Sequence, residues 1–323
     1  MSSIIRIGSR QSRLAVIQAE LIKEQIESLH PEIRAEIVTM KTTGDKILDK
    51  SLAAIGGKGL FVRELDKALE AGDIDISVHS LKDMPMETPK ALPILAYSKR
   101  EDPRDVLVFP PDTKEDSAKS PKERALEREA LLSEAGAVIG TSSFRRSLQL
   151  KQLYPRCAFR GIRGNVQTRL NKLKAEGYTA TVLAAAGLHR LGMRHVIGRY
   201  LSVEEMIPAA GQGILAVQGR AGEGHPYLEG IDDGASKAAA LAERAFVCAL
   251  DGGCTSPVAA YAKVSGRELV LTGLYCEAVS PGSSGGEIPP CGAFFVERIT
   301  GEKEQAEKLG ETLALRMRKE AGR

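Results

Sequence analysis

The sequence contains no tryptophan, and aromatic residues make up only 4% of its 323 positions. Surfaces that bind single-stranded nucleic acid stack bases on aromatic side chains, so this composition argues against that function. Long apolar runs are also missing: the longest weakly polar run, Ala180 to Leu188, is too short to span a bilayer. The N-terminus lacks the continuous apolar region of a signal peptide. We therefore expect a cytoplasmic protein that binds neither membranes nor nucleic acid.

Two further absences exclude common cofactor sites. The five cysteines include no Cys-x-x-Cys pair, and the sequence predicts no metal site. Gly56-Gly57-Lys58-Gly59 has the composition of a lid but lacks the spacing of a phosphate-binding P-loop, so nucleotide binding is not supported. A hydrophobic content of 43% is typical of a globular protein, and the length suffices for two or three domains.

The most informative absence is that of acidic residues between Glu134 and Glu176. Because the formal net charge of the whole chain is only +3, this stretch is a local feature. Arginine offers a planar fork of donors that matches carboxylate or phosphate. The stretch therefore predicts an anion-binding site, and a solvated basic face is the alternative. Its basic residues are Arg145, Arg146, Lys151, Arg156, Arg160, Arg163, Arg169, Lys172 and Lys174.

Loops that enter helices strengthen the prediction of an anion site. Gly140-Thr141-Ser142-Ser143 precedes Arg145-Arg146, and Arg163-Gly164-Asn165 precedes Arg169. Free backbone N–H groups and the positive end of the helix dipole favour anions at such junctions. Ser9-Arg10-Gln11-Ser12 is a third junction of this kind, for which a plain helix N-cap is an equal alternative.

Strands and helices alternate in two successive units, which predicts sheets with helical crossovers. The polar, proline-bounded segment Pro110 to Pro121 separates the two units. The last part of the chain has consecutive strands between two helices, which favours a small antiparallel α+β domain. The predicted strands are Ile4–Gly8, Ile33–Met40, Ile74–Val78, Ala137–Gly140, Cys157–Ile162, Thr179–Ala184, Val258–Val264, Glu268–Cys276 and Ala293–Thr300. The predicted helices are Arg10–Leu29, Leu60–Ala71, Ser143–Leu153, Val166–Ala175, Ser236–Leu250 and Glu302–Lys319.

Two segments carry side chains suited to chemistry. Val78-His-Ser-Leu-Lys-Asp83 follows a strand, at the edge where ligands bind open α/β sheets. There Ser80 and Lys82 are able to contact an anion, and Asp83 is able to stabilise a cation or move a proton; a surface ion pair is the alternative. The turn Asp251 to Pro257 exposes the Cys254 thiol, and an inert thiol is the alternative. We interpret His79 as a structural histidine.

Taken together, these segments resemble the porphobilinogen deaminases, also called hydroxymethylbilane synthases, over nearly the whole chain. The resemblance rests on many motifs in one order. They are Gly8-Ser-Arg-Gln-Ser12, Gly44-Asp45, Gly56-Gly-Lys-Gly-Leu-Phe61, Val78-His-Ser-Leu-Lys-Asp83, Arg100-Glu-Asp-Pro-Arg-Asp105, Gly140-Thr-Ser-Ser-Phe-Arg-Arg146, Arg163-Gly-Asn165 with Thr168-Arg169, Ala185-Ala-Gly-Leu188 with Arg190-Leu-Gly192, Pro208-Ala-Ala-Gly-Gln-Gly213, Leu241-Ala-Glu-Arg244 and Gly252-Gly-Cys254.

The resemblance implies a transferase of tetrapyrrole biosynthesis. Four porphobilinogen molecules would be joined head to tail into hydroxymethylbilane with release of ammonia. The chain would grow on a dipyrromethane cofactor held covalently through a thioether to Cys254. Asp83 would be the catalytic carboxylate beside the pyrrole N–H groups. The cofactor- and substrate-binding residues implied by motif match are Arg10, Ser12, Lys58, Ser80, Lys82, Thr141, Ser143, Arg145, Arg146, Arg163, Arg169 and Arg190.

The resemblance also implies two periplasmic-binding-protein-like α/β domains and a smaller C-terminal α+β domain with an antiparallel sheet. Domain 1 would comprise residues 1–105 and 214–231, domain 2 residues 106–213, and domain 3 residues 232–323. We expect a monomer. The rival hypothesis is a non-catalytic cytosolic protein that binds carboxylated ligands in the same two-domain cleft. The regions Pro110 to Pro121 and Ser280 to Cys291 look like departures from the family's usual loops.

Overall fold

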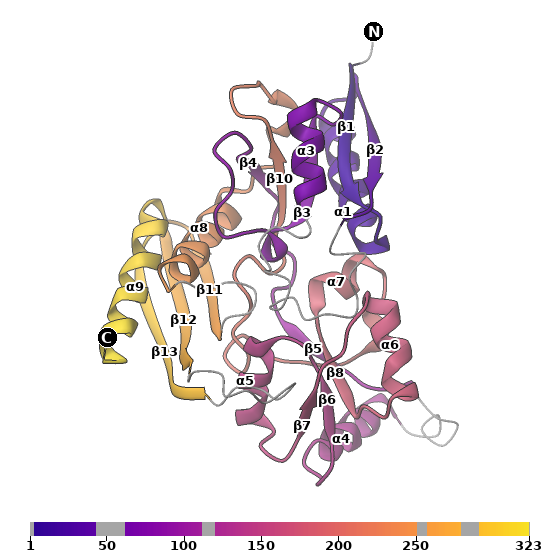
Figure 1. The fold of residues 1–323 in the computed structure, drawn as a ribbon, viewed down its shortest axis with the longest axis vertical. Helices are drawn as coiled ribbons and strands as arrows, with labels where there is room; N and C mark the ends of the chain where they lie inside the picture. The colour runs from indigo at the N-terminus through magenta and orange to yellow at the C-terminus, as the bar shows by residue number, and fades with distance from the viewer. Residues whose placement is uncertain (1–2, 43–61, 112–119, 251–256, 279–290, 323) are drawn as a thin grey trace.

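The computed structural model describes residues 3–42, 62–111, 120–250, 257–278 and 291–322. In these residues the chain forms two five-stranded mixed sheets covered by helices and one smaller antiparallel sheet (Figure 1). The fold class expected from the sequence is confirmed.

The first sheet has the strand order β2-β1-β3-β10-β4. β1 pairs in parallel with β2 and β3, whereas β10 is antiparallel to both of its neighbours, β3 and β4. Isoleucines and valines of these strands pack against α1 in one core. The strands are β1 (Ser3–Arg10), β2 (Ile33–Met40), β3 (Ile76–Ser80), β4 (Ile94–Tyr97) and β10 (Leu215–Gly219), with helices α1 (Arg13–Leu29) and α3 (Arg63–Ala71).

Local signals in the sequence explain where the helices of this sheet begin and end. The Ser12 side chain accepts a hydrogen bond from the Ala15 N–H and caps α1. α3 ends at Gly72, whose φ of 75° is the left-handed conformation that glycine adopts without a Cβ penalty. Ser12 thus sets where α1 begins, and Gly72 sets where α3 ends.

The second sheet, of order β7-β6-β8-β5-β9, repeats the plan of the first. Three strands are parallel, and β5 lies antiparallel between β8 and β9. In each sheet the antiparallel strand thus follows a passage of the chain from the other sheet. The elements are β5 (Asp105–Val108), β6 (Val138–Gly140), β7 (Ala158–Arg160), β8 (Ala180–Ala184), β9 (Ile197–Tyr200), α4 (Pro121–Leu131), α5 (Phe144–Leu153), α6 (Val166–Ala175) and α7 (Ala185–Arg190).

The third sheet is an antiparallel meander of β11 (Val258–Ser265), β12 (Glu268–Ala278) and β13 (Cys291–Glu302). Helices α8 (Gly234–Ala249) and α9 (Ala306–Glu320) pack against it around the buried Phe246 and Leu313. Short 3₁₀ turns at 81–83, 194–196, 226–228 and 303–305 complete the described elements. Figure 1 shows this unit beside both larger ones.

Two chain crossings join the larger sheets, one between β4 and β5 and the other between β9 and β10. They lie side by side, because Glu101 N donates to the Gly213 carbonyl at 3.1 Å. Gly213 has a φ of 94°, and a Cβ there would meet the carbonyl oxygen of Glu101, so only glycine permits this approach. The crossings therefore form one fixed junction between the two sheets.

Candidate active site

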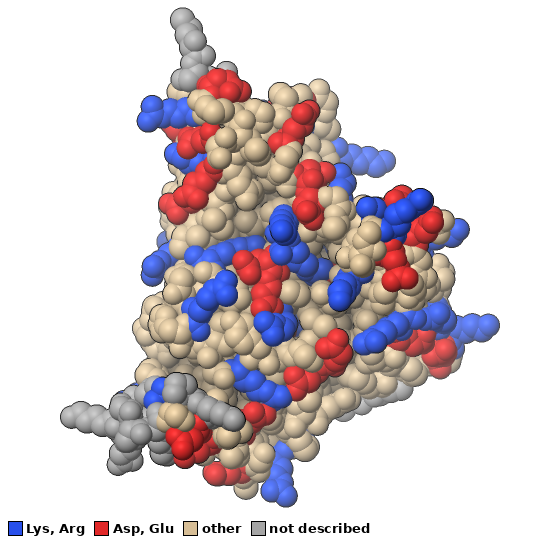
Figure 2. Space-filling view, turned by 180° about the vertical axis from the view of Figure 1, so that it is seen from behind, with Lys and Arg blue, Asp and Glu red and all other residues tan. Residues whose placement is uncertain are grey.

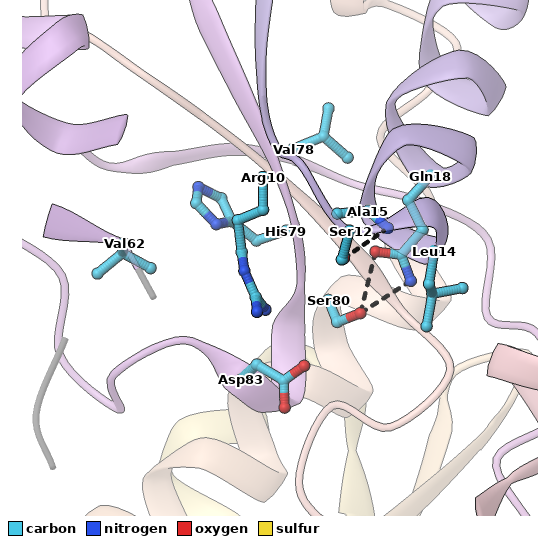
Figure 3. A pocket seen from close by; sticks show the side chains of 10 residues that line it. All are labelled: Arg10, Ser12, Leu14, Ala15, Gln18, Val62, Val78, His79, Ser80 and Asp83. Atoms are coloured by element: carbon cyan, nitrogen blue, oxygen red, sulfur yellow. Dashed lines mark hydrogen bonds between the residues drawn. The ribbon is translucent and has the colours of Figure 1, made fainter. Parts of the chain in front are cut away.

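The carboxyl ends of β1 and β3 place several predicted site residues around one pocket. Because these strands are parallel neighbours, Arg10 at the end of β1 and Ser80 at the end of β3 come to the same sheet edge. Asp83 follows in a 3₁₀ turn formed by Leu81–Asp83. Figure 3 shows the Arg10 and Asp83 side chains pointing into the same space, and Ser12 and Ser80 next to the Gln18 side chain.

The polar groups around this pocket have different surroundings. Asp83 is exposed, so its carboxylate is accessible to a ligand. The Ser80 hydroxyl accepts a hydrogen bond from Gln18 Nε2 at 2.8 Å (Figure 3). His79 is buried with Nε2 2.8 Å from Ser77 Oγ. Burial and the nearby Arg10 lower the pKa of His79 to about 4, so the ring is neutral at neutral pH.

Lys82 links this pocket to the second sheet. Its Nζ donates to Gln212 Oε1 at 3.3 Å, and Asp83, Asp105, Arg145 and Arg146 are close enough to act on its charge. Burial lowers the pKa of Lys82 to about 8, although Asp83 and Asp105 favour the charged form. The ammonium is therefore held at the boundary between the two larger units, with a charge that is sensitive to mildly alkaline pH.

Arg145 and Arg146 lie in the first turn of α5, where they are buried. Each donates to a different oxygen of Asp105 at 2.7 Å. Arg145 also donates to the Ile207 carbonyl, and Arg146 to the Val182 carbonyl. Burial alone would raise the pKa of Asp105, but the two guanidiniums hold it well below its usual range. The stretch without acidic residues between Glu134 and Glu176 thus pairs with a carboxylate from another part of the chain, that of Asp105 at the start of β5.

The other arginines that the sequence predicts for the site are half-buried. Arg169 Nε donates to the Gly164 carbonyl at 2.8 Å, and burial and Arg146 lower the pKa of Arg169 to about 10, with Asp83 opposing the shift. Asp83 and Arg169 therefore influence each other across the two units. Arg190 Nη2 donates to the Gly213 carbonyl at 2.6 Å, and burial lowers its pKa to about 10. Arg163 lies at the loop that enters α6.

The two hydroxyl residues predicted before α5 shape its N-terminus. Ser143 is the N-cap, and its side chain accepts from the Arg146 N–H. Thr141 is buried, and its Oγ1 accepts from the Ser143 N–H at 3.1 Å. Both therefore orient the start of the helix that carries the arginine pair.

Lys58 and Cys254 lie outside the described residues. The helix that leads towards Cys254 is described: α8 contains Arg244, whose guanidinium donates to the carbonyls of Pro85 and Met86. Pro85 and Met86 lie two and three residues after Asp83 in the chain. Arg244 therefore fixes the position of α8 relative to the segment that carries Asp83.

Sequence reasoning missed three residues of this region. Asp105 and Gln212 stood within motifs of the resemblance, Arg100 to Asp105 and Pro208 to Gly213, but no role was attached to them. Gln18 lies one and a half turns along α1 from its cap, on the face towards Ser80. A helical wheel of α1 places the polar Gln18 on the buried stripe, and this is the signal in the sequence that would have identified it.

Comparison with known proteins identifies the family of this chain. The family model described as porphobilinogen deaminase, dipyromethane cofactor binding domain, matches residues 5–226, and the model of the C-terminal domain of the same family matches residues 237–279. The chain belongs to the porphobilinogen deaminase family. Porphobilinogen deaminase from Ruminiclostridium josui is 48% identical over 97% of both chains. The enzyme of the same name from Acetivibrio thermocellus is 47% identical over 98% of this chain and 99% of the relative.

Solved structures match the chain only with low identity and low TM-scores. The aliphatic sulphonate binding protein SsuA from Escherichia coli matches 77% of this chain and 70% of its own, with 12% identity and a TM-score of 0.37. The effector binding domain of BenM matches 72% of this chain and 89% of its own, with 15% identity and a TM-score of 0.39. No helix in the described ranges is long and apolar enough to cross a membrane. Those ranges also contain no group of three metal-ligating side chains.

Proposed function

We infer that this protein joins four porphobilinogen molecules head to tail into hydroxymethylbilane, with release of ammonia, in tetrapyrrole biosynthesis. The observation that carries the proposal is the pocket at the ends of β1 and β3, where exposed Asp83 faces Arg10 in a chain whose family match spans 5–226. A carboxylate in cationic surroundings suits a substrate that carries acetate and propionate groups and a basic nitrogen.

The residues fit the dipyrromethane cofactor of the family. Each pyrrole ring carries two carboxylates, and Arg10, Lys82 and Arg169 offer cationic groups around Asp83. Bound dipyrromethane would supply the primer to which substrate units are added. We propose that Cys254 holds it through a thioether, because a soft sulfur nucleophile forms a carbon–sulfur bond that resists hydrolysis.

Asp83 has the environment of a group that handles protons and positive charge. Its carboxylate is exposed at the pocket, and it acts electrostatically both on Lys82 and on Arg169. In the proposed reaction it accepts hydrogen bonds from pyrrole N–H groups, stabilises the positive charge that develops as the amine leaves, and takes up the proton that the attacking pyrrole carbon loses at coupling.

The arginines divide into two roles. The first group contacts carboxylates of the bound pyrrole chain. It comprises Arg10, Arg163, Arg169 and Arg190, with Lys58, Lys82, Ser12 and Ser80. Arg145 and Arg146 already pair with Asp105. Because two guanidiniums face one carboxylate, one positive charge is not neutralised, and the pair acts on the substrate through that charge. Thr141 and Ser143 support them by orienting the start of α5.

We also propose three domains that follow the sheets: residues 1–105 with 214–231, 106–213, and 232–323. β10 in the first sheet supports the return of the chain to domain 1. A monomeric, cytoplasmic enzyme that binds no nucleic acid completes the proposal. On the face in Figure 2, basic and acidic side chains are interspersed, without the broad basic patch that nucleic-acid binding requires.

Intact mass before and after incubation with porphobilinogen tests the function. We expect a resting adduct of two pyrrole units and stepwise additions with substrate. Cys254→Ser removes the adduct, and Cys248→Ser, which replaces an exposed thiol on α8, retains it. An unmodified polypeptide from cells that make the cofactor, which binds porphobilinogen without additions, would favour the rival carboxylate-binding protein.

A further inference from the structure

Gln212 is a buried polar residue at the point where the chain returns from the second sheet to the first. Its side-chain amide makes contacts in both directions. Oε1 accepts from Lys82 Nζ at 3.3 Å, while Nε2 donates to the Pro103 carbonyl at 2.7 Å and to Asp105 Oδ1 at 3.1 Å. One amide thus bridges the segment beside Asp83 and the carboxylate that holds the arginine pair.

The backbone around Gln212 is held in place on both sides. Gly211 has a φ of 73°, and a Cβ there would lie 2.6 Å from the Leu81 side chain. The Gly211 N–H donates to Glu243 at 2.7 Å, and the Gln212 carbonyl accepts from Arg100 Nε at 2.9 Å. Because the main chain is fixed, the amide has one place in which to make its contacts.

The chemistry of the position requires a group that accepts and donates at once. An amide oxygen accepts from the ammonium while the amide nitrogen donates to the carboxylate. A methionine of similar size would remove one hydrogen bond from Lys82 and one from Asp105. A glutamate would attract Lys82 more strongly, but it would repel Asp105 and draw Lys82 away from Asp83.

We propose that Gln212 is a positioning residue that holds the Lys82 ammonium between Asp83 and the Arg145–Arg146 pair, and so fixes the two halves of the site relative to each other. This inference rests on the proposed function. It adds a role for Gln212, which acts through Lys82 and Asp105 and does not contact the reacting atoms of the substrate. Among the described residues, the charged groups that act on Lys82 include Asp83 on its own turn, Asp105 on β5, and Arg145 and Arg146 on α5. The amide is neutral, so it orients the ammonium without adding to this balance of charges.

Two variants separate positioning from folding. In Gln212→Glu, the new carboxylate beside Lys82 favours its charged form, so the pH at which Lys82 loses its proton rises. In Gln212→Met, the hydrogen bond to a charged partner is lost, and we expect kcat to fall roughly ten- to a hundredfold with a smaller change in KM. The matched control is Gln149→Met, because Gln149 is also buried but bonds only the backbone at Ile207 and Arg145.

The decisive readout is the pH dependence of Lys82 acylation, measured by peptide mass in the resting protein with acetic anhydride. In the wild type we expect a midpoint at about 8. We expect a higher midpoint in Gln212→Glu, an unchanged one in Gln149→Met, and the same upward shift in the alkaline limb of kcat/KM for Gln212→Glu. A midpoint in Gln212→Glu that equals the wild-type value would overturn the proposal, even if Gln212→Met does not fold.

The same experiment distinguishes failure of this inference from failure of the proposed function. Acylation of Lys82 needs no substrate and no turnover. A shifted midpoint in a protein that forms no hydroxymethylbilane would reject the function and retain the coupling of Gln212 to Lys82. Normal kcat and KM in a folded Gln212→Met enzyme would reject the positioning role alone.

Discussion

Arg100 and Glu243 form a two-pronged ion pair in the interior of the protein. Arg100 Nη1 donates to Glu243 Oε1 at 2.6 Å, and Nη2 donates to Oε2 at 3.1 Å. The same carboxylate accepts backbone N–H groups of Gly211 and Ala262, each at 2.7 Å. Glu243 on α8 therefore joins both chain crossings to the third sheet.

Removal of this carboxylate is expected to destabilise the protein strongly. In Glu243→Ala, the Arg100 guanidinium and two N–H groups lose their buried partner, and we expect a loss of about 3–5 kcal/mol in the free energy of unfolding. Urea unfolding measures it. Lys172→Ala, which breaks the exposed Lys172–Glu176 pair, is the control and should cost no more than about 1 kcal/mol. Equal losses in both variants would contradict the structural role of Glu243.

Asp105 predicts how stability depends on pH. Its pKa is lower in the folded protein than its usual 3.8, so its contribution is present above about pH 4 and is lost as pH falls towards the folded value. Asp105→Asn should lower stability at pH 7 and make the loss of stability below pH 4 shallower than in the wild type. Glu134→Gln, at an exposed position in the same unit, should leave both unchanged. Denaturant titrations at several pH values decide, and an unaltered acid slope in Asp105→Asn would count against the depressed pKa.

Asp83→Asn tests the catalytic carboxylate. Because Asp83 is exposed, the amide should leave the thermal unfolding temperature close to that of the wild type. Ammonia release should fall by about 10²–10⁴-fold, since the group that stabilises charge and moves a proton is lost. Glu87→Gln alters another exposed carboxylate of the following loop and should retain activity. Full activity in Asp83→Asn would exclude the proposed role.

Arg169 and Arg156 provide a matched pair within the acid-free stretch. Arg169 is half-buried and interacts electrostatically with Asp83, whereas Arg156 is exposed and donates to the Ser133 carbonyl at 3.5 Å. Arg169→Gln should raise KM for porphobilinogen by about tenfold or more and slow the stepwise mass additions, because a charge-assisted contact to a carboxylate is lost. Arg156→Gln should behave as the wild type. Similar defects in both variants would indicate a general effect of net charge.

Regular elements with a strong period were predictable from the sequence. Val166–Ala175 and Ile33–Met40 have the bounds expected. α1 begins at Arg13 instead of the expected Arg10, because Arg10 is the last residue of β1 and Ser12 caps the helix. The short strands β4 and β9 were not predicted, because four residues give no measurable alternation and their pairing is set by partners distant in the chain. The pairing of β10 with β3 and β4 is of the same kind: the resemblance implied the return, and periodicity did not.

The sequence predicts those parts of the candidate site in which the residue type alone indicates the chemistry. The run of arginines indicated an anion site, and Asp83 stood out as a carboxylate at a strand end. The pairing of Arg145 and Arg146 with Asp105 depends on how β5 inserts beside β8, which no local pattern encodes. The role inferred for Gln212 depends in the same way on the meeting of two chain crossings.

The position of β10 also bears on how the protein is made. In the first sheet β4 pairs with β10, and these strands are separated in the chain by the whole of the second sheet. During synthesis the N-terminal sheet therefore cannot be completed until residue 219 has left the ribosome, whereas the second sheet, built from residues 105–200, is able to form earlier. The edge of β3 that later accepts β10 stays open meanwhile. The unit that is translated first is thus completed only after the second unit. A nascent chain that stalls between β9 and β10 would present the open edge of β3 to chaperones or to other chains.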